Sequence, residues 1–493
     1  MTSIRTTSIK TLALASTAAL LAYGSAQAAD LPLKAKAVEY VKICSVYGAG
    51  FYYIPGTDTC IKLGGYLRAD TTLYGGGAYD APAWNGNAGA KNRLANNYIF
   101  RSRNDLNIDT RTATEYGVVR TYFDATFNWT TGTGSVAGAD FLNGATTGIG
   151  VYYAFVQFAG FTFGKAVSQF DTPWTGYPGN NTSFLIGGYD DVTGINQVSY
   201  TAQFGNGVSA AISLEDPSSY LQSALYNTFT PAASVTGGFG TNSYAGVQVP
   251  DIVGQVRVDQ AWGLFQVSAA AHQIRASYYT PTLETSGHPD DTWGYAVQAA
   301  LSIKNLPTGP GDSFNITATY SDGATRYVIG GVSPNSFAIY GSSEIAYQSV
   351  AFAHAADGVF WGPNNVIGSN IEKTTAWGVR GAFNHNWNPF WSSSLFGSYS
   401  SIDYNSTATA RISTAWGSTF NPDFRIAQIG AVTRWTPVKN LTLSGEVLYT
   451  YLDQANTGVV PITAIPALAK PGAVYEFKDQ GVWSGNLRVQ RTF

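Results

Sequence analysis

The sequence predicts an all-β fold, a transmembrane antiparallel up-and-down β-barrel of sixteen strands with short periplasmic turns and long extracellular loops. Three observations predict it. Polar and apolar residues alternate with a period of two along most of the chain, as in strands with two different faces. Long and short gaps alternate between these strands. Aromatic residues gather at both strand ends, as they do at membrane interfaces.

The composition agrees with this fold and excludes several classes of protein. The 493-residue chain has 12% charged residues, 14% aromatic residues and 54 Gly, whereas a soluble domain has about 25% charged residues. The aromatic content and a net charge of only -3 argue against disorder. Because 28 Lys and Arg face 31 Asp and Glu, we expect no nucleic-acid partner.

Residues 1–28 are predicted to be a signal peptide. Arg5 and Lys10 precede an apolar run, and Ala26-Gln27-Ala28 offers a cleavage site. An uncleaved anchor is disfavoured because the apolar run is too short to span a bilayer. In an oxidising compartment, Cys44 and Cys60 are expected to form a disulfide. We therefore expect residues 29–60 to be an N-terminal periplasmic or lumenal segment with this cysteine pair, and residues 61–493 to be the barrel.

The strands are placed by the two-residue period. From residue 61 to residue 73 the odd positions are mostly apolar, and the even positions include Lys62, Arg68 and Asp70. Sixteen such stretches begin near residues 61, 98, 115, 150, 161, 197, 208, 251, 264, 293, 312, 374, 391, 424, 441 and 481. The gaps between them alternate from long to short, so all large loops lie at one end of the sheet. This layout is typical of outer-membrane barrels.

Aromatic residues favour a membrane barrel over a soluble propeller or sandwich, which would also show period two. Trp262, Trp391 and Trp435 lie at short turns. The other band lies at the long-loop ends and consists of Trp129, Trp293, Tyr320, Tyr399, Tyr451 and Trp483. The chain ends on Phe493, an aromatic residue suited to anchor the closing strand at the membrane boundary.

Several segments resemble the alphaproteobacterial (rhizobial-type) outer-membrane porin family. They are YGAGFYYIPGTDTC at 47–60, GGY at 64–66, YTAQFGNG at 200–207, GYAVQ at 294–298 and RVQRTF at 488–493. The resemblance implies a sixteen-stranded barrel that assembles as a homotrimer in the outer membrane of a Gram-negative bacterium, among its lipid and lipopolysaccharide. It also implies passive diffusion of small hydrophilic solutes and ions, a third long loop folded into the lumen, and recognition of Phe493 by the barrel-assembly machinery. The chain departs from the family at Gly164-Lys165, where Gly-Arg is expected, and in its very long sixth and eighth loops.

No motif favours an enzyme, a metal site or a cofactor. The four His lie in no His-Glu-x-x-His frame, and the two Cys lack the spacing of a zinc site. The Gly160 to Lys165 segment is one residue short of a phosphate-binding loop, and no Gly-x-Ser-x-Gly motif occurs. We therefore expect a channel whose mechanism is physical.

The expected pore constriction combines an acidic loop with a basic wall. The third loop, residues 170–196, holds Asp171, Asp190 and Asp191 and no Lys or Arg. The expected wall cations are Lys62, Arg68, Arg101, Arg103, Arg120 and Arg488. If the loop folds inward, acids and cations face each other across the channel, and the resulting field would set ion preference.

The alternative function is a solute-specific channel, for instance for a sugar, with a saturable site. Trp174, Tyr177, Phe184 and Tyr189 in the third loop would then supply a stacking platform. Saturable, competitive uptake favours this alternative, whereas flux linear in concentration favours general diffusion. A structural or adhesin role of the long loops is a third possibility. The sequence does not decide whether loops six and eight occlude the pore.

Overall fold

The structure is a computed structural model that describes residues 42–76, 81–131, 145–182, 184–190, 193–229, 235, 238–331, 333–416 and 420–493. The predicted signal peptide lies outside the described residues. Contacts divide the chain into two units, Met1–Ile43 and Cys44–Phe493. All described strands and helices belong to the second unit.

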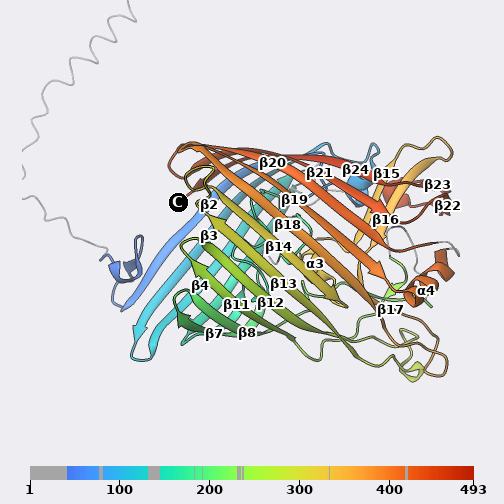
Figure 1. The fold of residues 1–493 in the computed structure, drawn as a ribbon, viewed down its shortest axis with the longest axis horizontal. Coiled ribbons are helices and arrows are strands. Elements are labelled where there is room, and N and C mark those ends of the chain that lie inside the picture. The colour runs from blue at the N-terminus through green and yellow to red at the C-terminus, as the bar shows by residue number, and fades with distance from the viewer. Residues whose placement is uncertain are drawn as a thin grey trace, which may run out of the picture. The chain divides into compact units, whose positions relative to one another are not determined.

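Sixteen antiparallel strands form a closed barrel (Figure 1). The ring closes where β2 pairs with β24, from Tyr66↔Thr492 to Leu73↔Gly485. This confirms the predicted sixteen-strand fold. The barrel strands are β2 (Thr59–Leu73), β3 (Tyr98–Thr114), β4 (Gly117–Thr131), β5 (Ala145–Phe158), β6 (Phe161–Ala166), β7 (Ile195–Gly205), β8 (Val208–Glu215), β11 (Asp251–Gln260), β12 (Gly263–Ile274), β13 (Thr292–Lys304), β14 (Ser313–Asp322), β18 (Glu372–Asn388), β19 (Trp391–Tyr404), β20 (Phe424–Val438), β21 (Leu441–Gln454) and β24 (Gln480–Thr492).

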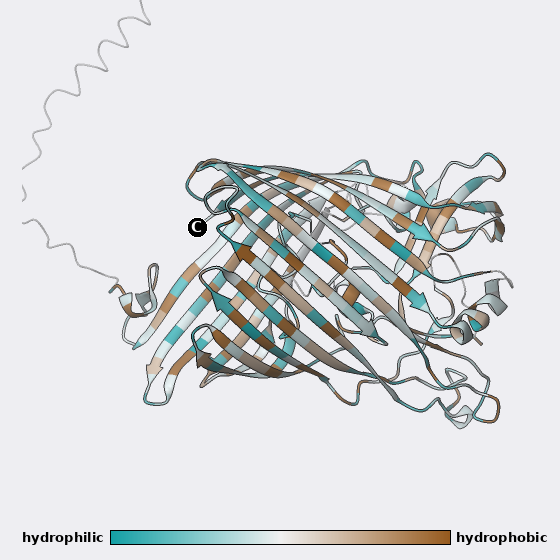
Figure 2. Ribbon diagram, viewed as in Figure 1, coloured by the Kyte–Doolittle hydropathy of each residue, from teal (hydrophilic) through white to brown (hydrophobic). Residues whose placement is uncertain are grey.

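The two-residue period separates a lumen face from an outer face. In β13, Trp293, Tyr295 and Val297 are exposed on the outside, whereas Ala296 and Gln298 are buried toward the lumen. Brown and teal bands alternate along the barrel strands in Figure 2. Large exposed apolar side chains on the outer face are expected for a surface in contact with lipid.

The two ends of the barrel differ in their connections. We call the end with short connections the turn end and the opposite end the loop end. Asn206 and Gly207 form a two-residue turn between β7 and β8, and their φ values of 49° and 73° match the hairpin turn that favours Asn-Gly. The chain ends at the turn end, at Phe493, where its N–H donates to Gly65 O at 3.0 Å.

The long loops carry structure of their own at the loop end (Figure 1). Loop 1 (74–97) contains α2 (Gly86–Ala90), and loop 7 (405–423) contains α4 (Ser406–Trp416). Loop 6 (323–371) and loop 8 (455–479) build a second, four-stranded sheet. Its strands are β15 (Ser336–Gly341), β16 (Gln348–His354), β22 (Val459–Ile462) and β23 (Ala473–Phe477).

Smaller elements complete the loops. Strand β1 (Tyr52–Tyr53) pairs with β2, and β9 (Ala224–Asn227), β10 (Thr241–Asn242) and β17 (Ala356–Phe360) extend the barrel sheet at the loop end. The short helices are α3 (Arg326–Ile329), η1 (Ser45–Tyr47), η2 (Glu284–Ser286) and η3 (Pro466–Leu468). Among the described residues, no helix is both long and apolar enough to cross a membrane.

Side chains from loops 1, 3, 4, 6, 7 and 8 share one apolar core at the loop end, which we call the cap. Phe337, Phe352 and Tyr475 are buried in it. The sequence analysis located loop 4 (216–250), loop 6 and loop 8 as long gaps and did not predict the strands inside them. In loop 8, β22 alternates exposed and buried positions, whereas β9, β16 and β17 of loops 4 and 6 are buried along nearly their whole length. Such strands read as short apolar runs without alternation, so the two-residue period does not find them.

Candidate functional site

The lumen-facing side chains of β2, β3, β4 and β24 form a charged surface that we call the cation face. Strand register places Arg68 opposite Arg103 and Asp70 opposite Arg101. Arg488 of β24 is also opposite Asp70. The cations of this face are Lys62, Arg68, Arg101, Arg103, Arg111, Arg120 and Arg488, and its acids are Asp70, Asp105, Asp109 and Asp124. The cation face therefore has an excess of positive charge.

Ion pairs fix part of the cation face at its two ends. Toward the loop end, Arg101 holds Asp70 with two hydrogen bonds, of which the Nε to Oδ1 bond measures 2.8 Å. Arg488 Nη2 lies 3.3 Å from the same carboxylate. Toward the turn end, Arg120 Nη2 lies 3.1 Å from Asp109 Oδ2. Each carboxylate thereby orders guanidinium groups from different strands.

Between these ion pairs, guanidinium groups lie on aromatic rings. Arg68 lies 4.4 Å from the centre of the Tyr66 ring and donates to Gln490 Oε1 at 2.8 Å. Arg103 lies 5.5 Å from the Tyr152 ring centre. A guanidinium held on a ring is positioned by that ring.

Loop 3, residues 167–194 in the structure, packs against lumen-facing side chains on the other side of the barrel. Gln266 Nε2 of β12 donates to Asp171 O at 2.7 Å, and Arg380 Nη1 of β18 donates to Leu185 O at 3.2 Å. Arg380 Nη2 also donates to Tyr189 O. Five more side chains donate to carbonyl groups of the loop, namely Gln298, Asn315, Asn384, Gln428 and Arg434. The Glu446 carboxylate accepts a hydrogen bond from Thr182 N. We call this surface, from β12 to β21, the loop-3 face.

The loop acids lie close to the loop-3 face. Asp171 and Asp190 are buried, with 0% and 2% of their surface exposed. The Asp171 carboxylate lies 4.0 Å from Arg380 Nη2 on the loop-3 face, whereas the sequence analysis expected it to face the basic wall of Lys62, Arg68, Arg101, Arg103, Arg120 and Arg488 across the channel. The reason is the direction in which loop 3 leans, because the wall side chains that hold its backbone belong to β12 through β21. Asp191 lies outside the described residues.

The structure gathers most of the expected basic wall. Arg68, Arg101, Arg103 and Arg488 occupy neighbouring positions on β2, β3 and β24. Lys62 and Arg120 lie nearer the turn end, beside Asp109. Arg111, which the sequence analysis did not select, also lies here, with its guanidinium 4.9 Å from the Phe51 ring centre. Its position on the lumen parity of β3 was a signal that could have identified it.

The predicted disulfide is confirmed. Cys44 and Cys60 are bonded, with their Cα atoms 6.0 Å apart, and both are buried. The bond ties η1 and β1 to the start of β2, at the turn end of the cation face. There the Lys62 ammonium lies 5.9 Å from the centre of the Phe51 ring. The N-terminal segment thus contributes aromatic rings to the turn end of this face.

A buried polar chain links loops 4 and 6 to the barrel, and the sequence analysis did not find it. His272 Nδ1 lies 2.7 Å from Asp251 Oδ1, and its Nε2 lies 3.2 Å from Tyr244 Oη. Tyr244 in turn donates to Asp357 Oδ2 at 2.8 Å. Asp357 also accepts from Thr325 N at 2.7 Å. These residues are separated by long loops, so no sequence spacing could reveal their contact.

Two of the four aromatic residues expected in a sugar-stacking platform, Phe184 and Tyr189, are buried, whereas Trp174 and Tyr177 are half-buried. Phe184 packs edge-on against Trp84 in the cap, and Tyr189 packs against Phe170 and Tyr327. Both rings are buried and so cannot stack on a solute. Within the described part of the chain, no group of three His, Cys, Asp or Glu could hold a metal ion.

The chain is similar in sequence to porins of Brucella. Porin Omp2b from Brucella canis is 34% identical over 266 residues, and Porin Omp2b from Brucella suis biovar 1 is 35% identical over the same length. Each match spans 52% of this chain and 63% of the relative's length, which is less than two thirds.

Among solved structures, the fold resembles the outer membrane channel DcaP of Acinetobacter baumannii. The TM-score is 0.56, with 16% sequence identity, over 90% of this chain and 99% of that chain. The family described as Porin subfamily matches residues 30–486 of this chain. Since that match spans nearly the whole barrel, the chain belongs to the porin subfamily and is a β-barrel protein of the Gram-negative outer membrane.

Proposed function

We propose that this protein is a porin that forms a water-filled channel for passive diffusion of small hydrophilic solutes and ions, without enzymatic activity. The observation that supports this most is the cation face, which lines the lumen on four neighbouring strands, β24, β2, β3 and β4. A barrel of sixteen strands is wide enough to hold water, unlike an eight-stranded one filled by side chains. Charged side chains on the lumen wall suit polar solutes.

Single-channel conductance of the purified protein in a planar bilayer tests this proposal. We expect discrete conductance steps that increase with salt concentration. A correctly folded barrel that gives no steps would contradict it. The heat-dependent shift in electrophoretic mobility of the same sample serves as the folding control.

A solute-specific channel is the second candidate. Its solute site would lie on the cation face and not at the aromatic residues of loop 3. Arg68 is half-buried and lies on the Tyr66 ring, so this pair combines a ring surface with an oxyanion donor. Such a pair suits an anionic ring compound, such as an aromatic or sugar carboxylate. Saturable uptake with competition between such compounds would favour this candidate, and flux linear in concentration would favour general diffusion.

The constriction is proposed to lie between loop 3 and the cation face. Asp171, Asp190 and Asp191 would supply its acidic side, and the cations named above its basic side. We also propose cleavage of a signal peptide after Ala28, a homotrimeric assembly, and contact with outer-membrane lipid and lipopolysaccharide. The exposed apolar side chains of the outer face support the last two.

We propose that Phe493 is read by the barrel-assembly machinery. Its side chain is 60% exposed at the turn end, so it is accessible at the end where the closing strand finishes. Deleting Phe493 should lower the yield of barrel in cells but not in detergent refolding, where no machinery acts. An unchanged cellular yield would contradict this role.

A further inference from the structure

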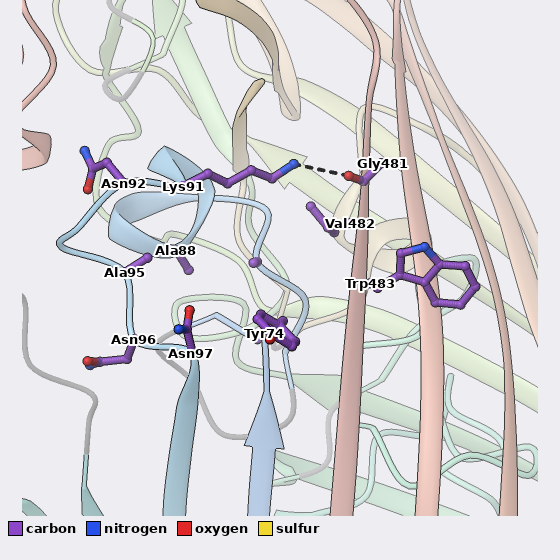
Figure 3. A pocket seen from close by; sticks show the side chains of 12 residues that line it. Tyr74, Ala88, Lys91, Asn92, Ala95, Asn96, Asn97, Gly481, Val482 and Trp483 are labelled. Atoms are coloured by element: carbon purple, nitrogen blue, oxygen red, sulfur yellow. Dashed lines mark hydrogen bonds between the residues drawn. The ribbon is translucent and has the colours of Figure 1, made fainter. Parts of the chain in front are cut away.

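The loops of the cap are attached to the barrel in two different ways. Loop 1 has an exposed contact, in which Lys91 Nζ donates to Gly481 O of β24 at 3.2 Å, beside a cavity of about 380 Å³ (Figure 3). Loops 4 and 6 are instead connected to the barrel through the buried polar chain around His272 of β12. We call this chain the latch, and its members are Tyr244, Asp251, His272, Tyr327 and Asp357.

Four donors around Asp357 show that this residue is an ionised carboxylate. The N–H and the hydroxyl of Thr325 donate to its Oδ1 at 2.7 and 2.9 Å. Ser223 N and Tyr244 Oη donate to its Oδ2 at 2.7 and 2.8 Å. A protonated carboxyl would offer fewer acceptor positions and would need an acceptor of its own. The single hydroxyl proton of Tyr244 is therefore used in the bond to Asp357.

The partners of His272 then determine the protons on its ring. Tyr244 has no second proton, so its oxygen accepts from His272 Nε2 across 3.2 Å. On the other side of the ring, Nδ1 lies 2.7 Å from Asp251 Oδ1, and Tyr327 donates to the second oxygen of that carboxylate. An imidazole is a stronger base than a carboxylate, so the proton between Nδ1 and Oδ1 belongs to the imidazole. Both ring nitrogens thus donate, and His272 is a cation.

The charged groups around His272 are mostly acids. The ring lies between Asp251 and Asp357, and Glu215 of β8 lies opposite Asp251 in the strand register. These residues have no exposed surface. The other titratable groups of this region are the hydroxyls of the two tyrosines and the guanidinium of Arg326, which interacts with Asp357. Removing the cation from a buried ion pair is strongly destabilising, because the remaining charge stays buried without its partner.

The latch connects several loops to the barrel wall. Tyr244 belongs to loop 4, whereas Tyr327 and Asp357 belong to loop 6. The ring of Tyr327 also packs against Phe170 and Tyr189 of loop 3, with ring centres 4.5 and 5.3 Å apart. The imidazolium is therefore connected to segments that build the cap and to a segment that contacts loop 3.

We propose that His272 is a positioning residue, which holds loops 4 and 6 on the barrel as a cation and releases them when it loses its proton to hydroxide at alkaline pH. The tyrosines of the latch keep their protons in this range, because burial raises the pKa of Tyr244 and Tyr327 well above the usual value. The consequence for the channel, a less restrained loop 3 with larger and noisier current, rests on the proposed function.

Nitrogen NMR of the imidazole rings tests the charge of His272 directly. The protein is purified without a histidine tag and refolded in detergent with nitrogen-15-labelled histidine, so that the signals come from four residues. The signal that is missing in His272→Gln belongs to His272. We expect it to be that of an imidazolium at neutral pH and of a neutral ring at alkaline pH. A neutral ring at neutral pH would overturn the proposal.

Hydrogen exchange of backbone amides, corrected for the intrinsic pH dependence of exchange, tests the release of the loops. In the wild type, α3 and β17 should lose protection over the pH range in which His272 loses its proton. His272→Gln is neutral at every pH, so α3 and β17 should exchange about tenfold faster at neutral pH and lose this pH dependence. Protection that stays unchanged in the wild type across the alkaline range, or in the variant at neutral pH, would overturn the proposal.

The matched control is His385→Gln. His385 Nδ1 also lies 2.7 Å from an aspartate oxygen, that of Asp312, but this pair lies at the turn end. The control should leave the exchange of α3 and β17 as in the wild type, and heat-dependent electrophoretic mobility shows that both variants are folded. Equally fast exchange in both variants would show a general loosening and would contradict a specific role of His272.

A lysine of the cap titrates in the same range with the opposite effect. Lys470 of loop 8 lies 4.1 Å from the centre of the Tyr340 ring, and burial lowers its pKa to about 8. Because burial disfavours the charged ammonium, loss of this proton favours the buried position of loop 8. Slower exchange in loop 8 at alkaline pH is therefore a separate effect, and it should persist in His272→Gln.

Conductance is measured separately from these experiments. A conducting wild-type channel should show larger and noisier current over the same alkaline range, and His272→Gln should show such current already at neutral pH. Current that does not change over this range would overturn the consequence for the channel. A protein without conductance steps would contradict the proposed function alone, because NMR and hydrogen exchange do not depend on conduction.

Discussion

The two faces of the lumen use the same residue type for different purposes. Arg380 on the loop-3 face donates to backbone carbonyls of loop 3 and lies 4.0 Å from the Asp171 carboxylate. Arg103 on the cation face contacts an amide oxygen of Asn128 at 2.6 Å and a tyrosine ring of the wall itself. Arg380 holds a loop, whereas Arg103 is held by side chains of the wall itself. Strand parity places both in the lumen, but only their partners distinguish their roles.

The largest effect is expected from Arg380→Gln. Arg380 is only 1% exposed, and removing one partner from a buried charged contact costs about 3–5 kcal/mol. Loop 3 would lose its central anchor while the strand pairs around it remain. We therefore expect noisier and larger single-channel conductance with an intact barrel.

Arg425→Gln is the matched control for this change. Arg425 lies on the neighbouring part of the barrel and is 39% exposed, 3.9 Å from Asp403. An exposed ion pair contributes about 0–1 kcal/mol, so conductance should not change. Equal conductance of both variants would mean that Arg380 does not hold loop 3.

The second prediction concerns the cation face. Replacing Arg68 and Arg103 by Gln should shift the reversal potential toward cations, because the positive excess of this face falls. Charges act over roughly 8 Å at physiological salt and roughly 3 Å at 1 M salt, so the shift should shrink as salt rises. Thermal stability is expected to fall with the change at Arg103, which is buried and donates to Asn128, and to change little with the change at the half-buried Arg68. A shift that is independent of salt would contradict a direct electrostatic role.

The barrel could be predicted from sequence because each strand carries its own signal. In β13, outward Tyr295 and Val297 alternate with inward Ala296 and Gln298, and this period needs no knowledge of the neighbouring strands. The same parity placed the side chains of Arg68 and Arg101 in the lumen. The disulfide followed from the number of cysteines and the compartment.

The cap and the partners of loop 3 could not be predicted in this way. Buried loop strands such as β17 lack alternation, and the contact between Asp171 and Arg380 joins residues far apart in the chain. A loop of this length can pack against either side of the lumen. It packs against the side whose wall residues offer hydrogen-bond partners. That information lies in the assembled barrel, not in any segment.

The third prediction concerns the loop acids. The triple change of Asp171, Asp190 and Asp191 to Asn should move the reversal potential toward anions. We expect a smaller shift than for the Arg68 and Arg103 changes, because Asp171 is buried beside Arg380 and its charge is partly balanced there. A shift as large as that of the cation-face variant would place these acids in the narrowest part of the channel. An unchanged selectivity at low salt would remove them from it.

The smallest effect is expected from reduction of the Cys44–Cys60 disulfide. The two residues are 16 positions apart, and a loop of this size contributes about 3 kcal/mol by chain entropy, little beside the pairing of sixteen strands. Reduced protein should keep its barrel, as shown by unchanged heat-dependent electrophoretic mobility. The local effect is on the cation face, because the bonded segment holds Phe51 against Arg111 and Lys62. A slight change in selectivity with an intact barrel is therefore the expected result, whereas loss of the barrel on reduction would show that this segment supports the fold as well as the turn end of the cation face.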